Sequence, residues 1–390
     1  MKVAFLTQYN LDDKHSWSGS IFHIRKCLEL AGAEVIPLDN LEQTKLYNLL
    51  RLKGKLYRKF YNKRLLVQRH PRVLKALARS ASRRLQHVDC DLIFSPGIFP
   101  IAYLKSDKPI LTWTDATFGG MIDYYEEFKG LTPESLDWGT QADHAGIRNS
   151  TVSVYSADWA RQTAIELHGA DPRRAHVVAF GANVPDQRSI ADIKQILEEK
   201  SWDICRLLFI GVDWVRKGGD LAVAVAQSLI DKGIPTELHI VGCTPPRPLP
   251  SFAKLHGFLS KKNPNDVNKL DSLFRAAHFF ILPSVAECFG VVFCEASSYG
   301  LCSFATQTGG IPSAVAEGKN GWTFKLGSGP EPYTARIEAL WADHASFNRY
   351  SEAAFQEYTT RLSWPAAAKG IAPLLLEAIE LGHKSTSGVR

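Results

Sequence analysis

The sequence predicts an α/β protein built from two doubly wound domains, and three observations support this prediction. Twelve short apolar runs rich in Val, Ile, Leu and Phe recur along the 390 residues. Runs of this kind, with little polar alternation, are typical of strands that are buried on both faces of a parallel sheet. The segments between them are long enough for helices, and the chain exceeds the ~100–200 residues of one ordinary domain.

The elements follow in two sets of six. Strands are expected at residues 3–7, 34–38, 92–95, 110–113, 151–155 and 176–180, and then at 206–211, 237–241, 254–258, 279–282, 302–305 and 322–325. Helical periodicity lies between the strands, as where Ile21, Ile24 and Leu28 share one face. Alternation of strand and helix in each half indicates two Rossmann-like domains.

The boundary between the halves is expected within residues 181–200, where a loop precedes a short helix at 190–199. A last helical region begins near Ser363 and continues through Ile379, and Pro373 is expected to kink or break it. The predicted domains are residues 1–183 and 184–365. Residues 366–390 form a C-terminal helix and tail, expected to pack back on the first domain.

The formal net charge of +6 comes from one segment. Thirteen Lys or Arg side chains and no acid lie between Arg51 and Arg84, whereas the other residues carry 33 basic and 40 acidic side chains. A nucleic-acid-binding protein usually spreads positive charge over a whole face. The composition therefore favours a mildly acidic enzyme that carries one concentrated basic segment.

The cysteine pattern and the N-terminus predict a cytoplasmic protein. The seven cysteines form no C-x-x-C pair and match no zinc spacing, as expected of buried thiols in a reducing compartment. The first residues lack the pattern of a signal peptide, and no segment has 18 uninterrupted apolar residues.

The segment PSVAECFGVVFCEASSYG, from Pro283 to Gly300, carries the strongest functional signal. It follows an apolar strand, turns, and enters a helix near Gly290, so Glu287 lies in the loop and Glu295 in the helix. Open backbone N–H groups at a helix start bind anions or hydroxyls, and a rigid carboxylate accepts hydrogen bonds from sugar hydroxyls. The alternative is a buried turn with two incidental glutamates, but Glu is rarely buried without a partner.

The segment FIGVDWVRKGGD, residues 209–220, is a second strand-to-helix turn. Arg216 and Lys217 stand directly before two glycines, where the backbone can approach a phosphate closely. Two cations at this place would neutralise a diphosphate leaving group. A solvated basic helix start is the alternative.

Two further positions lie in the first half. Gly19 occupies the first strand-to-helix turn, and Asp115 comes just past the strand at 110–113, where its carboxylate should point into a cleft between the domains. An Asx turn or N-cap is the alternative for Asp115. No G-x-G-x-x-G fingerprint occurs, which argues against a nicotinamide dehydrogenase.

The segments ILPSVAECFGVVFCEASSYG, TGGIPSAVAEGKNGW and LLFIGVDWVRKGGDLAVAV together resemble signatures of retaining glycosyltransferases of family 4, of the E-x7-E type. The resemblance implies the GT-B fold, with two Rossmann-like domains facing across a cleft and a C-terminal helix crossing back. It also implies transfer of a hexose from a nucleoside diphosphate sugar with retained anomeric configuration.

The resemblance also implies roles for individual residues. Glu287 would contact the donor hexose, Glu295 the nucleotide ribose, and Lys217 the diphosphate. The other implied donor-binding positions are Gly19, Ser284, Phe289, Gly290, Val291 and Val292, with Phe258 and Leu259 in the stretch that recognises the base.

Two departures from the family pattern bear on catalysis. The usual arginine is missing at Val212, so Arg216 is expected to supply the second cation. The usual histidine is replaced by Thr114, which leaves Asp115 as the polar candidate of the first domain, with His144 as a spare.

No metal or other cofactor is expected, because cations and helix starts can neutralise the diphosphate. The one Asp-x-Asp pair, Asp89 and Asp91, precedes a strand at its amino end, away from the expected cleft, and indicates a turn.

The basic segment from Arg51 to Arg84 predicts helices before and after Pro71, each with an apolar stripe and a basic rim. Such helices attach to anionic lipid headgroups, so the cytoplasmic protein could sit on the inner face of a membrane and use a lipid-linked acceptor. Alternatively, the stripe packs on the sheet and the cations are only solvated.

Other functions are weighed against glycosyl transfer. A nucleotide-sugar epimerase shares the fold. A phosphorylase would need a lysine that binds pyridoxal phosphate, and no sequence motif for such a lysine can be recognised. A non-catalytic protein that binds sugars or lipid headgroups is motivated by the absent histidine. A nucleic-acid binder would need salt-sensitive affinity for oligonucleotides that depends on the basic segment.

Overall fold

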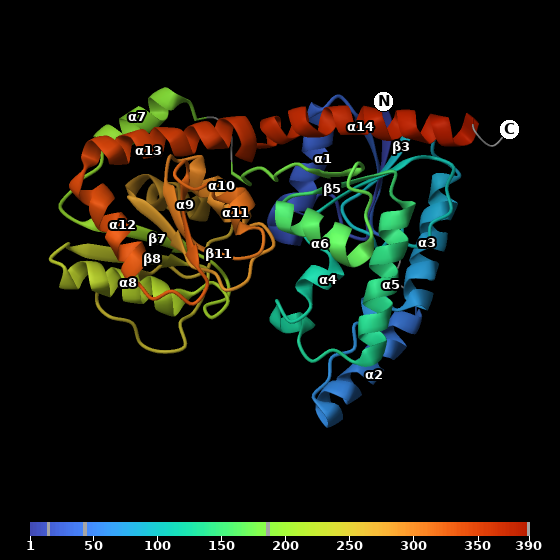
Figure 1. The fold of residues 1–390 in the computed structure, drawn as a ribbon, viewed down its shortest axis with the longest axis horizontal. Helices are drawn as coiled ribbons and strands as arrows, with labels where there is room; N and C mark the ends of the chain where they lie inside the picture. The colour runs from blue at the N-terminus through green and yellow to red at the C-terminus, as the bar shows by residue number, and fades with distance from the viewer. Residues whose placement is uncertain (14–15, 42–44, 185–187, 388–390) are drawn as a thin grey trace. The chain divides into compact units, whose positions relative to one another are not determined.

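The computed structural model describes residues 1–390 except 14–15, 42–44, 185–187 and 388–390 (Figure 1). The chain forms two compact units. The first comprises Met1–Ala179 together with Ala367–Arg390, and the second comprises Phe180–Ala366. The two doubly wound domains expected from the alternation of strands and helices are therefore present.

The first unit contains a six-stranded parallel sheet of order β2-β1-β3-β4-β5-β6. Its strands are β1 (Lys2–Leu6), β2 (Glu34–Leu38), β3 (Leu92–Ser95), β4 (Ile110–Thr114), β5 (Val152–Tyr155) and β6 (Ala175–Val177). Strands β3 and β5 are buried along their whole length, as predicted for strands that are covered on both faces of a parallel sheet.

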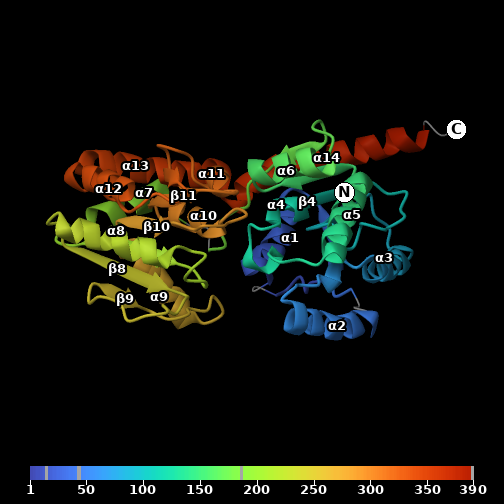
Figure 2. The ribbon, with the colours of Figure 1, turned by 60° about the horizontal axis from the view of Figure 1, so that its bottom comes forward.

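The helices of the first unit flank this sheet (Figures 1 and 2). They are α1 (Ser20–Leu30), α2 (Lys45–Tyr61), α3 (Pro71–Leu85), α4 (Phe118–Met121), α5 (Pro133–Asn149) and α6 (Asp158–His168), with the short 3-10 turns η1 (Ser16–Gly19), η2 (Val67–Arg69) and η3 (Glu126–Phe128). The expected helices before and after Pro71 are confirmed as α2 and α3.

The second unit repeats the design with a parallel sheet of order β12-β11-β10-β7-β8-β9. Its strands are β7 (Cys205–Ile210), β8 (Thr236–Val241), β9 (Ala253–Leu255), β10 (Phe279–Leu282), β11 (Cys302–Gln307) and β12 (Gly321–Lys325). Its helices are α7 (Ile190–Glu198), α8 (Gly219–Asp231), α9 (Pro264–Ala276), α10 (Val291–Ser297), α11 (Ile311–Ala314), α12 (Glu331–Ala342) and α13 (His344–Glu357). All twelve expected strands are thus present.

Two strands are shorter than the apolar runs predicted. Strand β6 ends at Val177 and β9 at Leu255, although the runs continue to Phe180 and Phe258. Both strands lie at the edge of their sheet, where only one neighbour fixes the ladder. In β9 the left-handed Gly257 (φ 67°) turns the chain directly afterwards.

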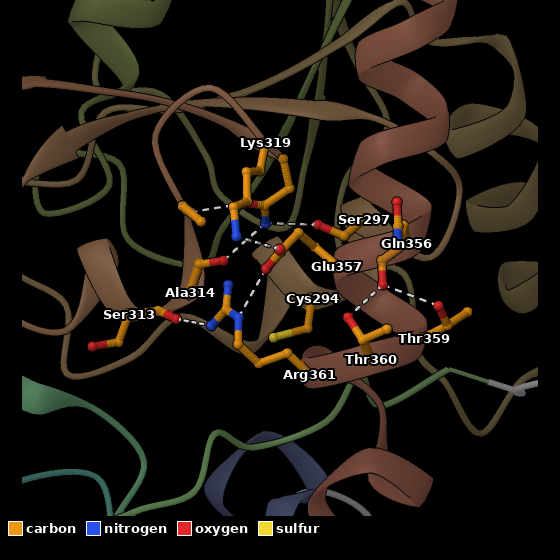
Figure 3. Close-up of polar contacts among 12 residues, drawn as sticks. Cys294, Ser297, Ser313, Ala314, Lys319, Gln356, Glu357, Thr359, Thr360 and Arg361 are labelled. Atoms are coloured by element: carbon orange, nitrogen blue, oxygen red, sulfur yellow. Dashed lines mark hydrogen bonds and ion pairs between the residues drawn. The ribbon is translucent and has the colours of Figure 1, made fainter.

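A single π-helical turn, η4 (Tyr358–Leu362), follows α13 and ties it to the loops that border α10 and α11 (Figure 3). The Arg361 Nε donates to Glu357 at 2.9 Å, and its guanidinium also donates to the Ser313 carbonyl. Lys319 approaches the same Glu357 carboxylate at 3.2 Å. Within the turn, the Thr359 and Thr360 hydroxyls both donate to the Gln356 carbonyl, at 3.0 and 2.7 Å, where the wider turn interrupts the ordinary helical ladder.

The last helix, α14 (Trp364–Ser387), begins in the second unit and belongs to the first unit from Ala367 onward. It continues through Pro373, so the expectation that this proline breaks the helix is wrong. Ile371, Leu375 and Ala378 are buried on one face of α14, and this packing holds the helix across the position where proline removes a hydrogen bond.

All seven cysteines are buried, as the sequence predicted, and none forms a disulfide with another described residue. Among the described residues, we find no helix that is both long enough and apolar enough to cross a membrane.

A buried histidine gives the second unit a predictable pH dependence. His278 Nδ1 accepts from the Arg206 backbone N–H, and Nε2 lies 3.0 Å from the Ser201 carbonyl. Burial, together with the nearby charges of Lys200 and Arg206, lowers the pKa of His278 to about 3. The folded unit therefore binds fewer protons than the unfolded chain between pH 6.5 and about 3.

Because the unfolded state gains the proton first, acidification through this window should destabilise the second unit by on the order of 5 kcal/mol. Hydrogen exchange of peptides from β7 and β10 at a series of pH values measures this loss. His278→Asn should flatten the dependence, whereas His87→Asn, at an exposed site, should leave it unchanged. A wild-type slope in His278→Asn would assign the titration to another group.

Candidate functional site

Two strand-to-helix turns lie side by side in the second unit. One turn (residues 211–218) follows β7 and the other (residues 283–290) follows β10, and these two strands are hydrogen-bonded neighbours. The Val285 backbone N–H donates to the Arg216 carbonyl at 2.8 Å, which joins the turns directly. The strand order reverses between β7 and β10, and ligands of doubly wound sheets bind at such a point.

Gly218 allows the two turns to approach each other. It adopts a left-handed conformation (φ 75°) immediately before α8, and a Cβ placed there would lie 2.1 Å from the Pro283 carbonyl oxygen. Only glycine satisfies both the backbone angle and the close approach.

Three charged side chains meet across these turns. Lys217 Nζ contacts Glu287 Oε2, and an Arg216 guanidinium nitrogen lies 3.4 Å from the same oxygen. Arg216 also donates to the Ala286 carbonyl at 3.1 Å, and its backbone N–H donates to Asp213 at 3.0 Å. The structure thus brings together Arg216, Lys217 and Glu287, which the sequence singled out in two separate motifs.

Their arrangement is suited to a polyanionic ligand. The side chains of Lys217 and Glu287 are about nine-tenths buried, so their attraction is screened less than that of a surface pair. Both cations share one carboxylate, which leaves donor capacity on the guanidinium and the ammonium for a phosphate oxygen. A carboxylate held in this way also presents a fixed acceptor.

The second glutamate of the motif lies inside α10 with a different partner. Glu295 is 6% exposed, and Lys261 Nζ contacts its Oε1 atom. Lys261 also donates to the Asn183 carbonyl at 3.1 Å, and the Asn183 side chain accepts from the Trp364 indole at 3.0 Å. The sequence analysis missed Lys261 and Asn183. A buried glutamate signals that a cation must be near, but the pattern does not say which one.

The start of α10 borders the charged cluster. Gly290 is left-handed (φ 88°), and the Glu287 carbonyl accepts from the Gly310 N–H at 3.0 Å. Val291 and Val292 are half-buried in the first turn, whose N–H groups have no acceptor within the helix. The side chains of Phe289 and Ser284 are buried beside this turn.

The predicted base-recognition residues follow β9. Phe258 is exposed and Leu259 is half-buried. Just before them, His256 stacks on His239 with 3.0 Å between Nε2 and Nδ1, and burial lowers the pKa of both imidazoles.

The candidates of the first unit occupy the carboxyl edge of its sheet. Gly19 is the left-handed N-cap of α1 (φ 90°), and Asp115 directly follows β4 and is half-buried. The spare candidate His144 lies on α5, with its ring 5.4 Å from that of His168. Gly19 and Asp115 therefore lie at the edge where ligands bind in sheets of this type.

The Asp-x-Asp pair lies before β3, as predicted. Asp91 accepts from the Lys2 backbone N–H at 2.8 Å, and Asp89 pairs with Lys2 Nζ at 3.0 Å. These contacts show a structural turn that fastens the start of β1. Across the described residues, no group of three or more His, Cys, Asp or Glu side chains is placed to hold a metal ion.

Residues 205–343 match the family described as Glycosyl transferases group 1. Among curated relatives, D-inositol 3-phosphate glycosyltransferase 2 of Catenulispora acidiphila is 27% identical over 242 residues, which are 58% of this chain and 56% of that protein. The D-inositol 3-phosphate glycosyltransferase of Geodermatophilus obscurus is 33% identical over 204 residues, 48% of this chain and 44% of that protein. The chain thus spans about half the length of these relatives.

Solved structures are similar over nearly the whole chain. Sucrose-phosphate synthase from Thermosynechococcus elongatus has a TM-score of 0.69 at 14% sequence identity. The alignment covers 97% of this chain and 98% of the synthase chain. HepE of Anabaena, in complex with UDP and glucose, has a TM-score of 0.61 at 15% sequence identity. The alignment covers 96% of this chain and 99% of the HepE chain. The likeness confirms the GT-B fold.

Proposed function

Because residues 205–343 match the group 1 glycosyl transferases, we propose that this GT-B protein transfers a hexose from a nucleoside diphosphate sugar to an acceptor hydroxyl. The observation that carries the proposal is the meeting of Arg216, Lys217 and Glu287 on two joined strand-to-helix turns. A diphosphate leaving group needs cations, and a hexose needs a rigid acceptor for its hydroxyls.

In the proposed reaction, the anomeric configuration is retained. The bond between the hexose C1 and the diphosphate oxygen breaks, and its electron pair leaves with the diphosphate. The acceptor oxygen bonds to C1 on the same face, and its proton passes to the departing phosphate oxygen. Arg216 and Lys217 stabilise the charge that develops there, with support from the helix start after Gly290.

The glutamates and the first unit have positioning roles in this proposal. Glu287 orients the hexose and Glu295 binds the ribose. The Glu295 carboxylate must then accept hydrogen bonds from the ribose hydroxyls while it keeps its contact with Lys261. Asp115 provides a polar group toward the acceptor. The reaction proceeds without metal because the two cations supply the neutralising charge.

The donor we propose is GDP-mannose or a UDP-hexose. The acceptor is a hydroxyl of a glycan, of a lipid-linked sugar, or of a small molecule such as the inositol 3-phosphate in the names of the curated relatives. The proposed setting is cytoplasmic.

A thermal-shift panel of UDP, GDP, ADP and their sugars identifies the donor, and chromatography of the nucleotide released then measures its hydrolysis. We expect one base to stabilise the protein and its sugar to be slowly hydrolysed in the presence of chelator. If wild type and Glu287→Ala both bind a nucleotide sugar and neither ever cleaves it, the chain is a binding protein rather than an enzyme.

A further inference from the structure

Helix α2 carries a stripe of apolar side chains that faces solvent. Leu49, Leu52, Leu56 and Phe60 follow one another at intervals of three, four and four residues, which places them on one face of the helix. They are 67%, 59%, 50% and 67% exposed. Single exposed apolar residues are ordinary, but a continuous exposed stripe marks an interaction surface. We call these four residues the outer stripe.

The outer stripe is not the face that attaches α2 to its unit. Leu50, Gly54 and Tyr57 occupy another face and are half-buried. The Cβ position at Gly54 lies 3.6 Å from Leu65 and 3.9 Å from Val67, so the helix packs there on the segment around η2. Both ribbon views place α2 at the periphery of the first unit (Figures 1 and 2). The packed face leaves the outer stripe uncovered by the described residues of this unit.

Cations surround the outer stripe. Arg51, Lys53, Lys55, Arg58 and Lys59 are all exposed on α2. None of these five forms an ion pair with any described residue, whereas Arg64 nearby pairs with Glu126 at 3.0 Å. No acid occurs between residues 45 and 85. The helix therefore presents an apolar strip with uncompensated positive charge.

The neighbouring helix α3 has a similar composition and the opposite arrangement. Its stripe is buried: Val73, Leu74, Leu77, Ala78 and Ala81 all pack inward. Its exposed cations, Arg72, Arg79 and Arg83, consequently have no exposed apolar stripe among them. In the basic segment, the apolar stripe therefore faces solvent on α2, whereas on α3 it packs against the rest of the unit.

We propose that α2 docks the protein onto an anionic lipid surface, with the outer stripe at the boundary between headgroups and acyl chains. Amphipathic helices with a basic polar face lie in this boundary, and each cation near the surface contributes to the attraction. Charge complementarity identifies the partner as anionic, and the apolar stripe distinguishes a lipid surface from a nucleic acid, whose backbone offers phosphates but no apolar layer. The proposal does not depend on the transferase activity.

The charge of α2 is tested by sedimentation of the full chain with vesicles of phosphatidylcholine alone or with about 40% phosphatidylglycerol, a model of an anionic leaflet. We expect binding to the anionic vesicles only. The variant Arg51→Gln/Lys55→Gln/Lys59→Gln should bind them on the order of 100-fold more weakly. The matched variant Arg72→Gln/Arg79→Gln/Arg83→Gln removes the same charge from α3 and should bind like wild type. Equal losses in the two variants would overturn the proposal.

Insertion of the outer stripe is tested with a fluorophore. All seven native cysteines are buried, so Leu56→Cys can be labelled selectively with an environment-sensitive dye. Anionic vesicles should increase its emission, and Leu49→Ser/Leu52→Ser should abolish sedimentation without lowering the melting temperature, because both side chains are exposed. An unchanged emission, or retention on oligonucleotides in preference to vesicles, would assign the surface to another partner.

Discussion

Lys217→Met should lower kcat/KM for donor hydrolysis and transfer by on the order of 1,000-fold, as loss of one preorganised charge-stabilising donor does in other enzymes. Lys217 is the cation in closest contact with Glu287, and in the proposed reaction it faces the departing diphosphate. Arg216 remains within 3.4 Å of the same carboxylate, so the site loses half of its positive charge. Steady-state kinetics with saturating acceptor measure the effect.

The same substitution has a structural cost that must be separated from the chemical one. Without Lys217, the largely buried Glu287 carboxylate loses its closest cation and keeps Arg216 as a neighbour, and we expect a loss of about 2 kcal/mol in stability. Adding Glu287→Gln removes the uncompensated charge. The double variant should therefore regain stability while remaining inactive.

Lys232→Met provides a matched control. Lys232 lies at the other end of α8 and pairs with Glu338 at 2.7 Å on the surface, where such pairs contribute little. We expect wild-type kinetics and a stability change below about 1 kcal/mol. If Lys217→Met and Lys232→Met have the same activity, Lys217 does not act on the diphosphate.

The sheets could be predicted from the sequence because their strands are buried on both faces. The runs that became β3 and β10 show no polar alternation, and both strands are buried throughout. The ends of β6 and β9 were overestimated because an apolar run does not say where an edge strand loses its only neighbour. Pro373 does not break α14, because tertiary packing of this helix outweighs the local preference.

The candidate site was predictable where its residues lie in local motifs. Arg216, Lys217 and Glu287 stand in two strand-to-helix turns, and adjacent strands bring those turns together. Lys261 is 34 residues from Glu295 and lies in no recognisable motif, so only the folded chain reveals the pair. The same limit applies to the surfaces of α2 and α3. The periodicity of each helix identifies its apolar face, but it does not predict whether that face is buried, as in α3, or exposed, as in α2.

One cation of the basic segment is not on the surface at all. Arg69, in η2, donates to Asp143 at 2.8 Å, and the two side chains are 7% and 4% exposed. The guanidinium also lies over the rings of Phe118 and Phe99, at 4.5 and 5.0 Å. Asp143 accepts in addition from the Phe118 backbone N–H at 2.6 Å. The pair therefore fastens η2, α5 and the start of α4 to one another.

Asp143→Ala should destabilise the first unit by about 3–5 kcal/mol, because it leaves a buried guanidinium and a buried N–H without their acceptor. Arg69→Met should cost less, since the Phe118 N–H still satisfies the carboxylate. Chemical denaturation, with hydrogen exchange of peptides that contain residues 116–122, locates the loss in this unit. Arg173→Met, which breaks an exposed pair with Asp171, should change stability by less than about 1 kcal/mol.

The double variant Arg69→Met/Asp143→Leu tests whether Arg69 and Asp143 stabilise the first unit as a pair or independently of each other. Replacing both charges with apolar groups removes their desolvation cost, so stability should recover relative to Asp143→Ala, although the Phe118 N–H remains unsatisfied. Arg69→Met should also leave vesicle binding unchanged, because a buried guanidinium cannot reach a headgroup. If Arg69→Met weakened vesicle binding as strongly as the α2 variant and left the unfolding transition in place, Arg69 would belong to the surface charge rather than to the core.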